Sequence, residues 1–294
     1  MGSLIRAITD GVLGGGVYGL MAVGLTLIFG VLDIINIAQG ILVVLGAYLT
    51  YVLWAHLHID QFLGLLITIP GMFILGVAIQ YLFIRPLRGR ERTSMSLLAC
   101  YSVTIIIEGI LYQIFGSNYV SINDYWTSPQ ATVQIFGYYL PYIYLLGFAL
   151  AVVSVMAIYL MLYRTQFGRS VRATMQDHTA ARLVGIDVNR VAAVTFGIGV
   201  AVTAAGGMVF GSLNAFNPNT GYDLISRLLA IVILGGMGSI GGALGAAVLM
   251  ITLESLVDVY WNPEWSVVVF YAVLVAVLVF RPQGLFGRKE ARAQ

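Results

Sequence analysis

Charged residues are scarce in this chain, and this scarcity decides its broad class. Asp, Glu, Lys and Arg make up 10% of the 294 residues, hydrophobic residues make up 60%, and the mean hydropathy is +0.92. Soluble globular domains carry roughly 25% charged residues, so an ordinary soluble fold is excluded. The formal net charge of +2 is too small to indicate a nucleic-acid partner.

The sequence also lacks the residues for several kinds of chemistry. Its single cysteine, Cys100, lies in an apolar run, which excludes an intrachain disulfide and gives no redox signal. No G-x-x-x-x-G-K-S/T phosphate-binding loop occurs in the chain, so we expect no ATPase activity from it. His56, His58 and His178 all fall in predicted loops, with no set of metal ligands and no nucleophile–base pair for an intramembrane enzyme.

Long apolar runs are what the sequence does have. Runs of about 20 residues, enough to cross a bilayer, fall at about 11–31, 35–54, 62–84, 95–115, 139–163, 191–213 and 264–280. A further region, about 224–257, is interrupted at 234–242 by LGGMGSIGG. Each flank is short for a full span, so we expect two short or broken helices there. The prediction is an all-α polytopic membrane protein of one domain, 1–294, with about eight membrane segments.

The basic residues predict how the chain is oriented, because cytoplasmic loops near span ends are enriched in Lys and Arg. Three groups follow the third, fifth and last spans: Arg85, Arg88, Arg90 and Arg92; Arg164, Arg169, Arg172, Arg182 and Arg190; Arg281, Arg288, Lys289 and Arg292. The loops 55–61, 116–138 and 254–265 contain no Lys or Arg. We therefore expect the three basic regions in the cytoplasm, the other loops outside, and, by parity, the N-terminus outside.

Two polar, glycine-containing breaks resemble each other. Residues 29–49 read FGVLDIINIAQGILVVLGAYL, and residues 233–251 read ILGGMGSIGGALGAAVLMI, which suggests an internal repeat of the same orientation. Paired helix breaks in corresponding halves of a membrane protein indicate a solute site, because broken backbone is tolerated only where it lines a cavity or is buried in protein. The predicted pathway residues are Asn36, Gln39, Gly40, Ser239, Gly241 and Gly242. The alternative is that the glycines only permit close helix packing.

The segment 164–190, RTQFGRSVRATMQDHTAARLVGIDVNR, is charged and has helical periodicity. After a helix-stopping cluster around Thr165 and Gly168, one amphipathic helix is predicted, ending in a turn at Gly185. Its apolar face would hold Val171, Met175, Ala180, Leu183 and Val184, and its polar face would hold Arg169, Arg172, Gln176 and Arg182. Docking of a soluble partner is the favoured role. The alternative is a solvated connector whose arginines reach lipid phosphates.

Glu108 lies in the middle of an apolar run and is a candidate intramembrane polar site, since a carboxylate in a span indicates function. A structural, hydrogen-bonded Glu is the alternative. Arg227 is placed to pair with Glu108 or with Asp223.

Several segments resemble a known family. Residues 179–185, TAARLVG, are similar to the EAAxxxG loop of ATP-binding-cassette (ABC) importer permeases, with Thr179 in place of the family's Glu. The stretches YGLMAVGLTLIFGVLDIINIAQG, RTQFGRSVRATMQDHTAARLVGIDVNRV, LGGMGSIGGALG and RPQGLFG resemble, in that order, the LivH-type permeases of branched-chain amino acid uptake. The resemblance covers nearly the whole chain. One departure concerns the first break, where family members commonly have NFAHG and this chain has NIAQG.

The resemblance implies a permease subunit in a bacterial inner membrane. The segment 164–190 would be its cytoplasmic coupling loop, with Arg169, Arg172, Ala180, Ala181 and Gly185 contacting an ATPase. The implied partners are a second permease subunit or a second copy, two ATP-binding subunits that use ATP and Mg, and a periplasmic or lipid-anchored solute-binding protein. This chain itself would bind no cofactor. Branched-chain or other hydrophobic amino acids are the favoured solutes. The alternatives are urea or short-chain amides, and a proton-coupled secondary transporter with Glu108 or Asp33 as its relay.

Overall fold

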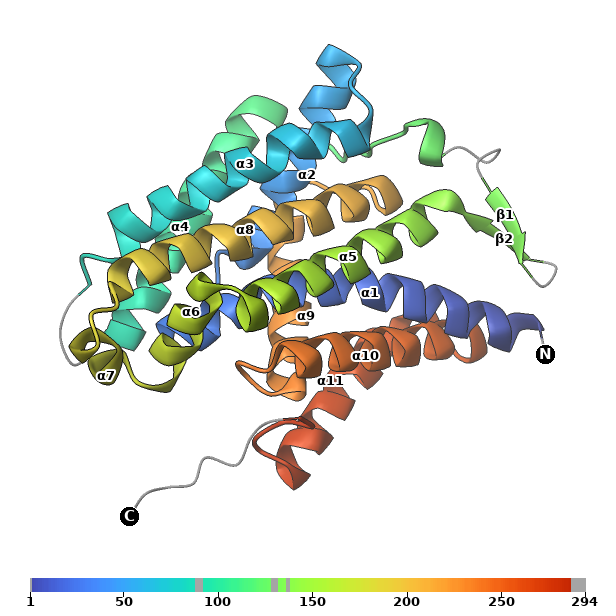
Figure 1. The fold of residues 1–294 in the computed structure, drawn as a ribbon. Coiled ribbons are helices and arrows are strands. Elements are labelled where there is room, and N and C mark those ends of the chain that lie inside the picture. Colours follow the sequence, from blue (N-terminus) through green and yellow to red (C-terminus); the bar gives the residue numbers. More distant parts are fainter. Residues whose placement is uncertain (1, 88–91, 128–131, 136–137, 287–294) are drawn as a thin grey trace.

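The computed structural model describes residues 2–87, 92–127, 132–135 and 138–286. The predicted basic residues Arg88, Arg90, Arg288, Lys289 and Arg292 lie outside the described residues. The helices are α1 (Gly2–Leu32), α2 (Gln39–Leu57), α3 (Gln61–Ile79) with the π-helical turn η1 (Gln80–Ile84), α4 (Arg92–Phe115), the 3-10 turn η2 (Tyr125–Thr127), α5 (Tyr142–Arg164), α6 (Gln166–Gln176), α7 (His178–Leu183), α8 (Val188–Leu213), α9 (Thr220–Gly235), α10 (Ile240–Tyr260) and α11 (Pro263–Phe280) (Figure 1).

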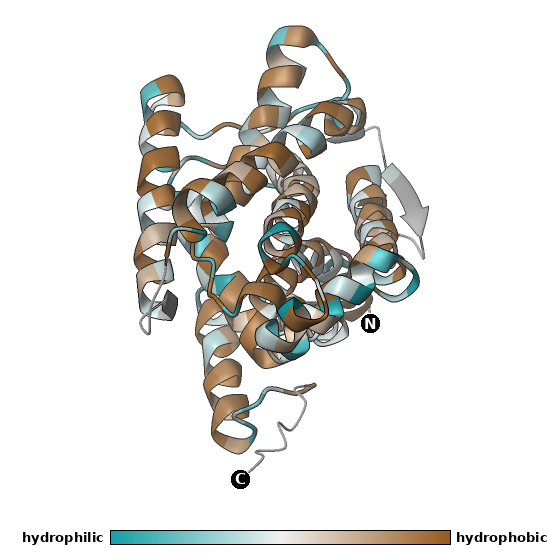
Figure 2. Ribbon diagram, turned by 60° about the vertical axis from the view of Figure 1, so that its left-hand side comes forward, coloured by the Kyte–Doolittle hydropathy of each residue, from teal (hydrophilic) through white to brown (hydrophobic). Residues whose placement is uncertain are grey.

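The all-α polytopic prediction is confirmed. Within the described residues, eight helices are long and apolar enough to cross a membrane. A short antiparallel hairpin of β1 (Thr132–Ile135) and β2 (Tyr138–Pro141) lies in the connection between α4 and α5. The helices on the outside of the bundle are predominantly hydrophobic along their length (Figure 2), as surfaces in contact with lipid must be.

The glycine-rich region 224–257 differs from its prediction. We expected two short helices, but α10 has 21 residues and is long enough for a full span, whereas α9 has 16. The chain turns at residues 236–239, where Gly236 and Gly238 have φ angles of 90° and 82°, a backbone conformation that glycine adopts without steric cost. Ser239 then caps α10 by accepting a hydrogen bond from the N–H of Gly242. Only α9 is therefore a short helix.

The centre of the bundle is formed by α1 and α8, whose spans are 78% and 83% buried, against 11% for α11. Glycines let these helices approach their neighbours closely. Along α1, Gly11 faces Thr252, Gly15 faces Val248 and Gly19 faces Leu244 of α10. The residue numbers rise along α1 while those of the contacted residues fall along α10, so the two helices pack antiparallel.

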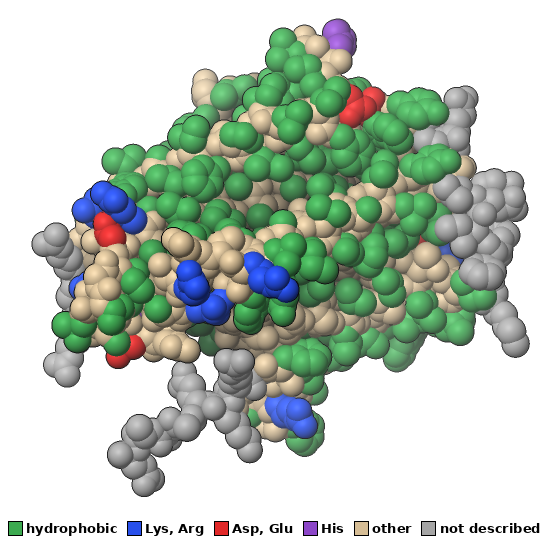
Figure 3. Space-filling view, in the orientation of Figure 1, with side chains coloured by type: hydrophobic (Ala, Val, Ile, Leu, Met, Phe, Trp, Pro, Cys, Tyr) green, Lys and Arg blue, Asp and Glu red, His purple; other side chains and the backbone are tan. Residues whose placement is uncertain are grey.

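Basic side chains gather at one end of the bundle. Figure 3 shows Lys and Arg side chains toward the end that carries α6 and α7, and Figure 1 places the start of α1 and the β1–β2 hairpin at the other end. The α6–α7 segment belongs to this basic end of the bundle (Figure 1).

Close packing of α1 on α10 gives a first prediction. A methyl group at Gly15 would lie 2.6 Å from the Cα of Val248, whereas one at Gly14 would meet only the side chain of Ile251, at 3.4 Å. Gly15→Ala should therefore lower the free energy of unfolding by about 1–3 kcal/mol, the cost of overpacking. Gly14→Ala, the control, should be neutral or slightly stabilising. Thermal unfolding in detergent measures both, and equal midpoints would contradict the close contact.

Candidate functional site

The first break, residues 33–38 between α1 and α2, holds a buried polar cluster. Asn36 and Gln39 are fully buried. The Nδ2 of Asn36 donates a hydrogen bond to the Oε1 of Gln39 at 2.9 Å, and the Nε2 of Gln39 donates to the Oγ1 of Thr203 on α8. Thr203 in turn donates to the carbonyl of Gly199. The Oδ1 of Asn36 makes no hydrogen bond within the described residues. The cluster thus ties the first break to the central helix α8.

Gly40, the next predicted pathway residue, lies at a close helix contact. A methyl group there would lie 2.0 Å from the carbonyl oxygen of Gly221 on α9 and 2.9 Å from the Cβ of Ile225. This geometry is the close approach that a glycine allows between α2 and α9.

In the second break, residues 236–239, the predicted residues differ in their surroundings. A methyl group at Gly242 would lie 2.0 Å from the carbonyl oxygen of Gly235, and Ser239 serves as the cap of α10. Gly241 is exposed, with no atom within 4 Å of a built methyl group. Gly242 therefore allows close packing, and Gly241 faces open space.

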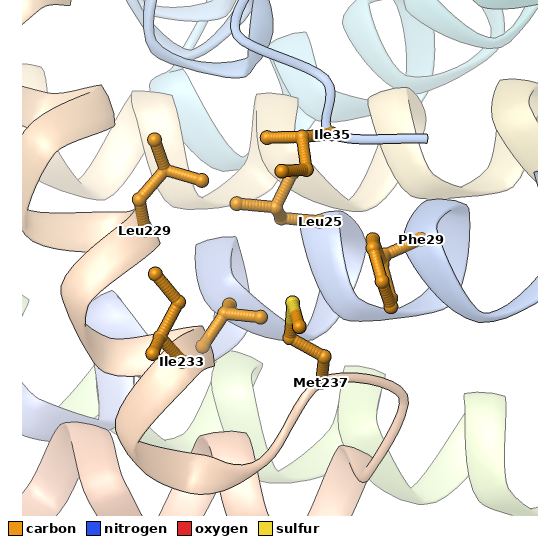
Figure 4. A pocket seen from close by; sticks show the side chains of 7 residues that line it. Leu25, Phe29, Ile35, Leu229, Ile233 and Met237 are labelled. Carbon is orange, nitrogen blue, oxygen red and sulfur yellow. The ribbon is translucent and has the colours of Figure 1, made fainter. Parts of the chain in front are cut away.

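The structure brings the two breaks together at a small cavity. Ile35 from the first break and Met237 from the second line it, with Leu25 and Phe29 of α1 and Leu229, Val232 and Ile233 of α9 (Figure 4). All seven lining residues are apolar, and the cavity volume is about 20 Å³, room for about one water-sized group. We call it the apolar cavity. The sequence analysis did not predict the cavity residues of α9. A signal was available, because these apolar residues are three and four positions apart on the helix that precedes the glycine turn.

Glu108 and Arg227, two ionisable residues of the membrane helices, both have polar partners. Glu108 of α4 accepts a hydrogen bond from the hydroxyl of Tyr222 on α9 at 2.7 Å. Arg227 pairs with neither of its predicted partners, Glu108 and Asp223. It donates instead to both carboxylate oxygens of Glu254 on α10, at 2.6 and 2.7 Å. This pairing was missed because Glu254 is 27 residues away along the chain. It joins α9 to α10 by a charge-assisted contact from one guanidinium nitrogen, Nη1, to both carboxylate oxygens.

The segment 164–190 forms two helices, which corrects the prediction of one. The predicted helix stop is confirmed at Thr165, whose extended backbone ends α5, and the same residue caps the start of α6 by accepting from the N–H of Gly168, which lies within α6. Asp177 has extended backbone, and its carboxylate accepts from the N–H groups of Thr179 and Ala180 to start α7. These two N–H groups also lower the pKa of Asp177, because they stabilise its charged form.

The predicted apolar face of this segment is divided between the two helices. Val171 of α6 is fully buried, but Leu183 and Val184 at the end of α7 are 85% and 75% exposed. We call Leu183 and Val184 the apolar tip. Gly185 follows it with a φ of +84° and open space around it, so the predicted turn at Gly185 is confirmed.

The other predicted coupling residues differ in their exposure and in their contacts. Arg169 and Ala180 are exposed and Ala181 is buried. Arg172 donates a hydrogen bond from its guanidinium to the carbonyl of Leu162 and lies 5.0 Å over the ring of Tyr163, so it secures α6 to the end of α5. Arg169 and Ala180, like the apolar tip, are therefore accessible at the surface of the α6–α7 segment.

The α6–α7 segment reaches the first break directly. The Nε2 of His178 lies 2.9 Å from the carbonyl oxygen of Val31, in the last turn of α1. Met175 packs against Gly30, since a methyl group built there would lie 2.5 Å from its Cε. The same built methyl group would lie 3.7 Å from the Cα of Gly238. Both breaks therefore adjoin the point where α6 and α7 contact α1.

His56, His58 and Asp60 serve the connection between α2 and α3. His58 ends α2 with a φ of 51°, and Asp60 caps α3 while accepting from the indole N–H of Trp126 at 2.7 Å. Among the described residues, no group of three or more His, Cys, Asp or Glu side chains is placed to hold a metal ion. Asp60 thus has a structural role at the end of the bundle opposite α6 and α7.

Residues 7–278 match the family described as the permease component of the branched-chain amino acid transport system. The chain belongs to this family. It is 28% identical to the high-affinity branched-chain amino acid transport system permease protein LivH of Salmonella typhimurium, over 97% of this chain and 96% of the relative. It is 27% identical to permease protein BraD of Pseudomonas aeruginosa over the same shares. Permease protein LivM of Salmonella typhimurium is 31% identical over 49% of this chain and 34% of its own length. The protein is a multi-pass transmembrane permease, and the resemblance seen in the sequence is confirmed.

The polar cluster at the first break gives a second prediction for this permease. Thr203→Val should leave the buried amide of Gln39 without its acceptor and lower the free energy of unfolding by about 1–3 kcal/mol. Thr195→Val is a matched control, because Thr195 is a fully buried residue of the same helix whose Oγ1 makes no hydrogen bond within the described residues. Thermal unfolding in detergent distinguishes them. Equal stability of the two variants would mean that the Gln39–Thr203 bond contributes nothing.

Proposed function

We propose that this permease is the membrane-spanning subunit of an ABC importer for branched-chain and other hydrophobic amino acids. It works with a second permease subunit, two ATP-binding subunits that use ATP and Mg, and an external solute-binding protein. The similarity of half the chain to LivM, itself a permease protein, supports a second permease subunit of related sequence.

The apolar tip is the observation that carries this proposal. Leu183 and Val184 are large apolar side chains, and they are exposed at the end of the bundle where the basic side chains gather. Apolar side chains presented together in water are typical of a protein contact. An ATP-binding subunit seated on this tip would cover them.

A route from this contact to the breaks is present in the structure. The tip belongs to α7, and His178 at the start of α7 contacts the last turn of α1. Met175 and Gly30 extend the contact to the second break. A partner that binds two states of the tip differently would shift the helices between two arrangements, and the first helices to move would be those that flank the apolar cavity.

The solute class follows from the family and from the interior. Relatives that span the whole chain are named branched-chain amino acid permeases. The apolar cavity between the breaks has room for only a water-sized group, but its lining has no polar side chain, and contact with such a lining would cost urea its hydrogen bonds to water.

The basic end of the bundle faces the cytoplasm in this proposal, and the membrane is the bacterial inner membrane. The third prediction tests this orientation in a Cys100→Ala background. Single cysteines at Asn123 and Glu264 should react with an impermeant maleimide added to intact cells, whereas one at Thr179 should react only after permeabilisation. All three positions are exposed. External labelling at Thr179 would invert the orientation and remove the apolar tip from the cytoplasm.

The fourth prediction concerns coupling. Leu183→Ser should sharply reduce both co-purification of the ATP-binding subunits and solute-stimulated ATP hydrolysis in the reconstituted transporter, because it removes apolar contact area from the tip. Leu57→Ser is the matched control: Leu57 is 61% exposed at the end of α2, far from α7. The proposal fails if Leu183→Ser leaves both measurements at the wild-type level.

A further inference from the structure

The helix α7 is attached to the spanning helices at its first residue. The imidazole of His178 reaches the last turn of α1, where its Nε2 lies 2.9 Å from the carbonyl oxygen of Val31. A carbonyl oxygen can only accept a hydrogen bond, so this contact requires a hydrogen on Nε2, which the neutral Nε2–H tautomer and the imidazolium both carry. Among the described residues, this is the side-chain hydrogen bond that joins α7 to a spanning helix.

The carbonyl of Val31 is one of those that the end of α1 leaves without a partner. The last four C=O groups of a helix have no acceptor role within it, and α1 ends at Leu32. One of the four, that of Phe29, accepts from the N–H of Asp33 at 2.9 Å, in a turn where Asp33 has a φ of 53°. The carbonyl of Val31 is bound by His178 instead. The end of α1 is therefore completed by a side chain from α7.

Separating His178 from Val31 would be costly. Val31 is fully buried, and a buried carbonyl that loses its donor retains the full cost of its removal from water. The imidazole–carbonyl bond is also directional. The neighbouring contact of Met175 with Gly30 is apolar, and such contacts are non-directional and permit sliding. The hydrogen bond therefore favours joint movement of α7 and the end of α1.

The α6–α7 segment has two attachments, and they lead to different helices. Arg172 of α6 bonds to the carbonyl of Leu162 at the end of α5. The apolar tip belongs to α7, which is joined to α6 through the extended residue Asp177. A displacement of the tip can thus reach α1 through His178 without first moving α5.

We propose that His178 is the positioning residue that transmits movement of the apolar tip to the end of α1 and to the first break. This inference rests on the proposed function. The first break, residues 33–38, follows α1 directly, and Gln39 at its far end is bonded to Thr203 of α8. A shift of the carbonyl of Val31 would therefore pull on one end of this short segment while Thr203 holds the other.

The test changes the reach of the side chain at residue 178 in the complete transporter reconstituted in vesicles. The amide nitrogen of glutamine lies about as far along the side chain as Nε2 of histidine, whereas that of asparagine is one methylene closer to the backbone. His178→Gln should therefore keep the wild-type amount of leucine imported per ATP hydrolysed. His178→Asn should still bind the ATP-binding subunits and hydrolyse ATP, but should import about five-fold less leucine per ATP or lower, a change at the small end of typical coupling between sites.

His56 provides the matched control. It is exposed at the end of α2, far from α7, so His56→Gln and His56→Asn should leave the amount of leucine per ATP unchanged. A second measurement needs no transport. It follows hydrogen exchange of the backbone amides of residues 29–38, with and without a non-hydrolysable ATP analogue on the ATP-binding subunits. The analogue should change this exchange several-fold in the wild type and in His178→Gln, but not in His178→Asn.

The outcomes separate this inference from the proposed function. If the wild type binds no ATP-binding subunits or imports no leucine with ATP, the proposed function itself is wrong. If it imports leucine and His178→Asn keeps the wild-type amount per ATP, only the inference about His178 is overturned. Loss of the ATP-binding subunits from His178→Asn would also overturn it, because the hydrogen bond would then only hold the docking surface. Equal losses in His178→Gln and His178→Asn, or exchange that the analogue leaves unchanged in the wild type, would reject it as well.

Discussion

The need to satisfy or bury every backbone polar group inside a membrane shapes this permease more than any other constraint. A helix that stops within the hydrocarbon region leaves unpaired N–H and C=O groups, which lipid cannot satisfy. In this chain α1 ends at residue 32 and the short helix α9 at residue 235, and each is followed by a non-helical segment, at residues 33–38 and 236–239. The fold places the two breaks beside each other, against α8 and the α6–α7 segment, where Thr203, Ser239 and Gly238 provide hydrogen bonds or close packing. Gly24 of α1 and Gly199 of α8 let these two helices approach each other closely beside Gln39, next to the first break.

Charged and polar contacts then fix the short helix α9 in place. Its Arg227 is bound to Glu254 of α10 on one side, and its Tyr222 is bound to Glu108 of α4 on the other. A pair inside a membrane protein is far less costly than either charge alone. The short helix α9, which has 16 residues, is therefore held by specific polar contacts to α10 and α4. This arrangement leaves one side of α9 open.

The main features of the fold could be predicted because membrane spans impose a length and a composition that a single sequence shows. The boundary of α10 was predicted less well, since Glu254 and Asp258 shortened its apolar run, and the sequence does not show that Arg227 neutralises Glu254. One helix was predicted in 164–190 because its periodicity is continuous, but the carboxylate of Asp177 competes for backbone N–H groups and starts a second helix. Asn36 and Gln39 stood out as polar residues in an apolar run, although their mutual bond was not visible. The cavity residues Leu229 and Ile233 were missed because apolar lining residues and apolar core residues look the same in sequence.

The attachment of α6 to α5 has a mechanical consequence. A methyl group at Gly168 would lie 2.2 and 2.3 Å from the carbonyl oxygens of Met161 and Leu162, and Arg172 bonds to the same Leu162 carbonyl. Only a residue without a side chain lets α6 fold back so closely onto the end of the spanning helix. Gly168 and Arg172 thereby hold α6 against the last turn of α5, whereas α7 is joined to α6 through the extended residue Asp177. In the importer that we propose, a force exerted on α6 by a bound subunit would therefore act directly on the end of α5.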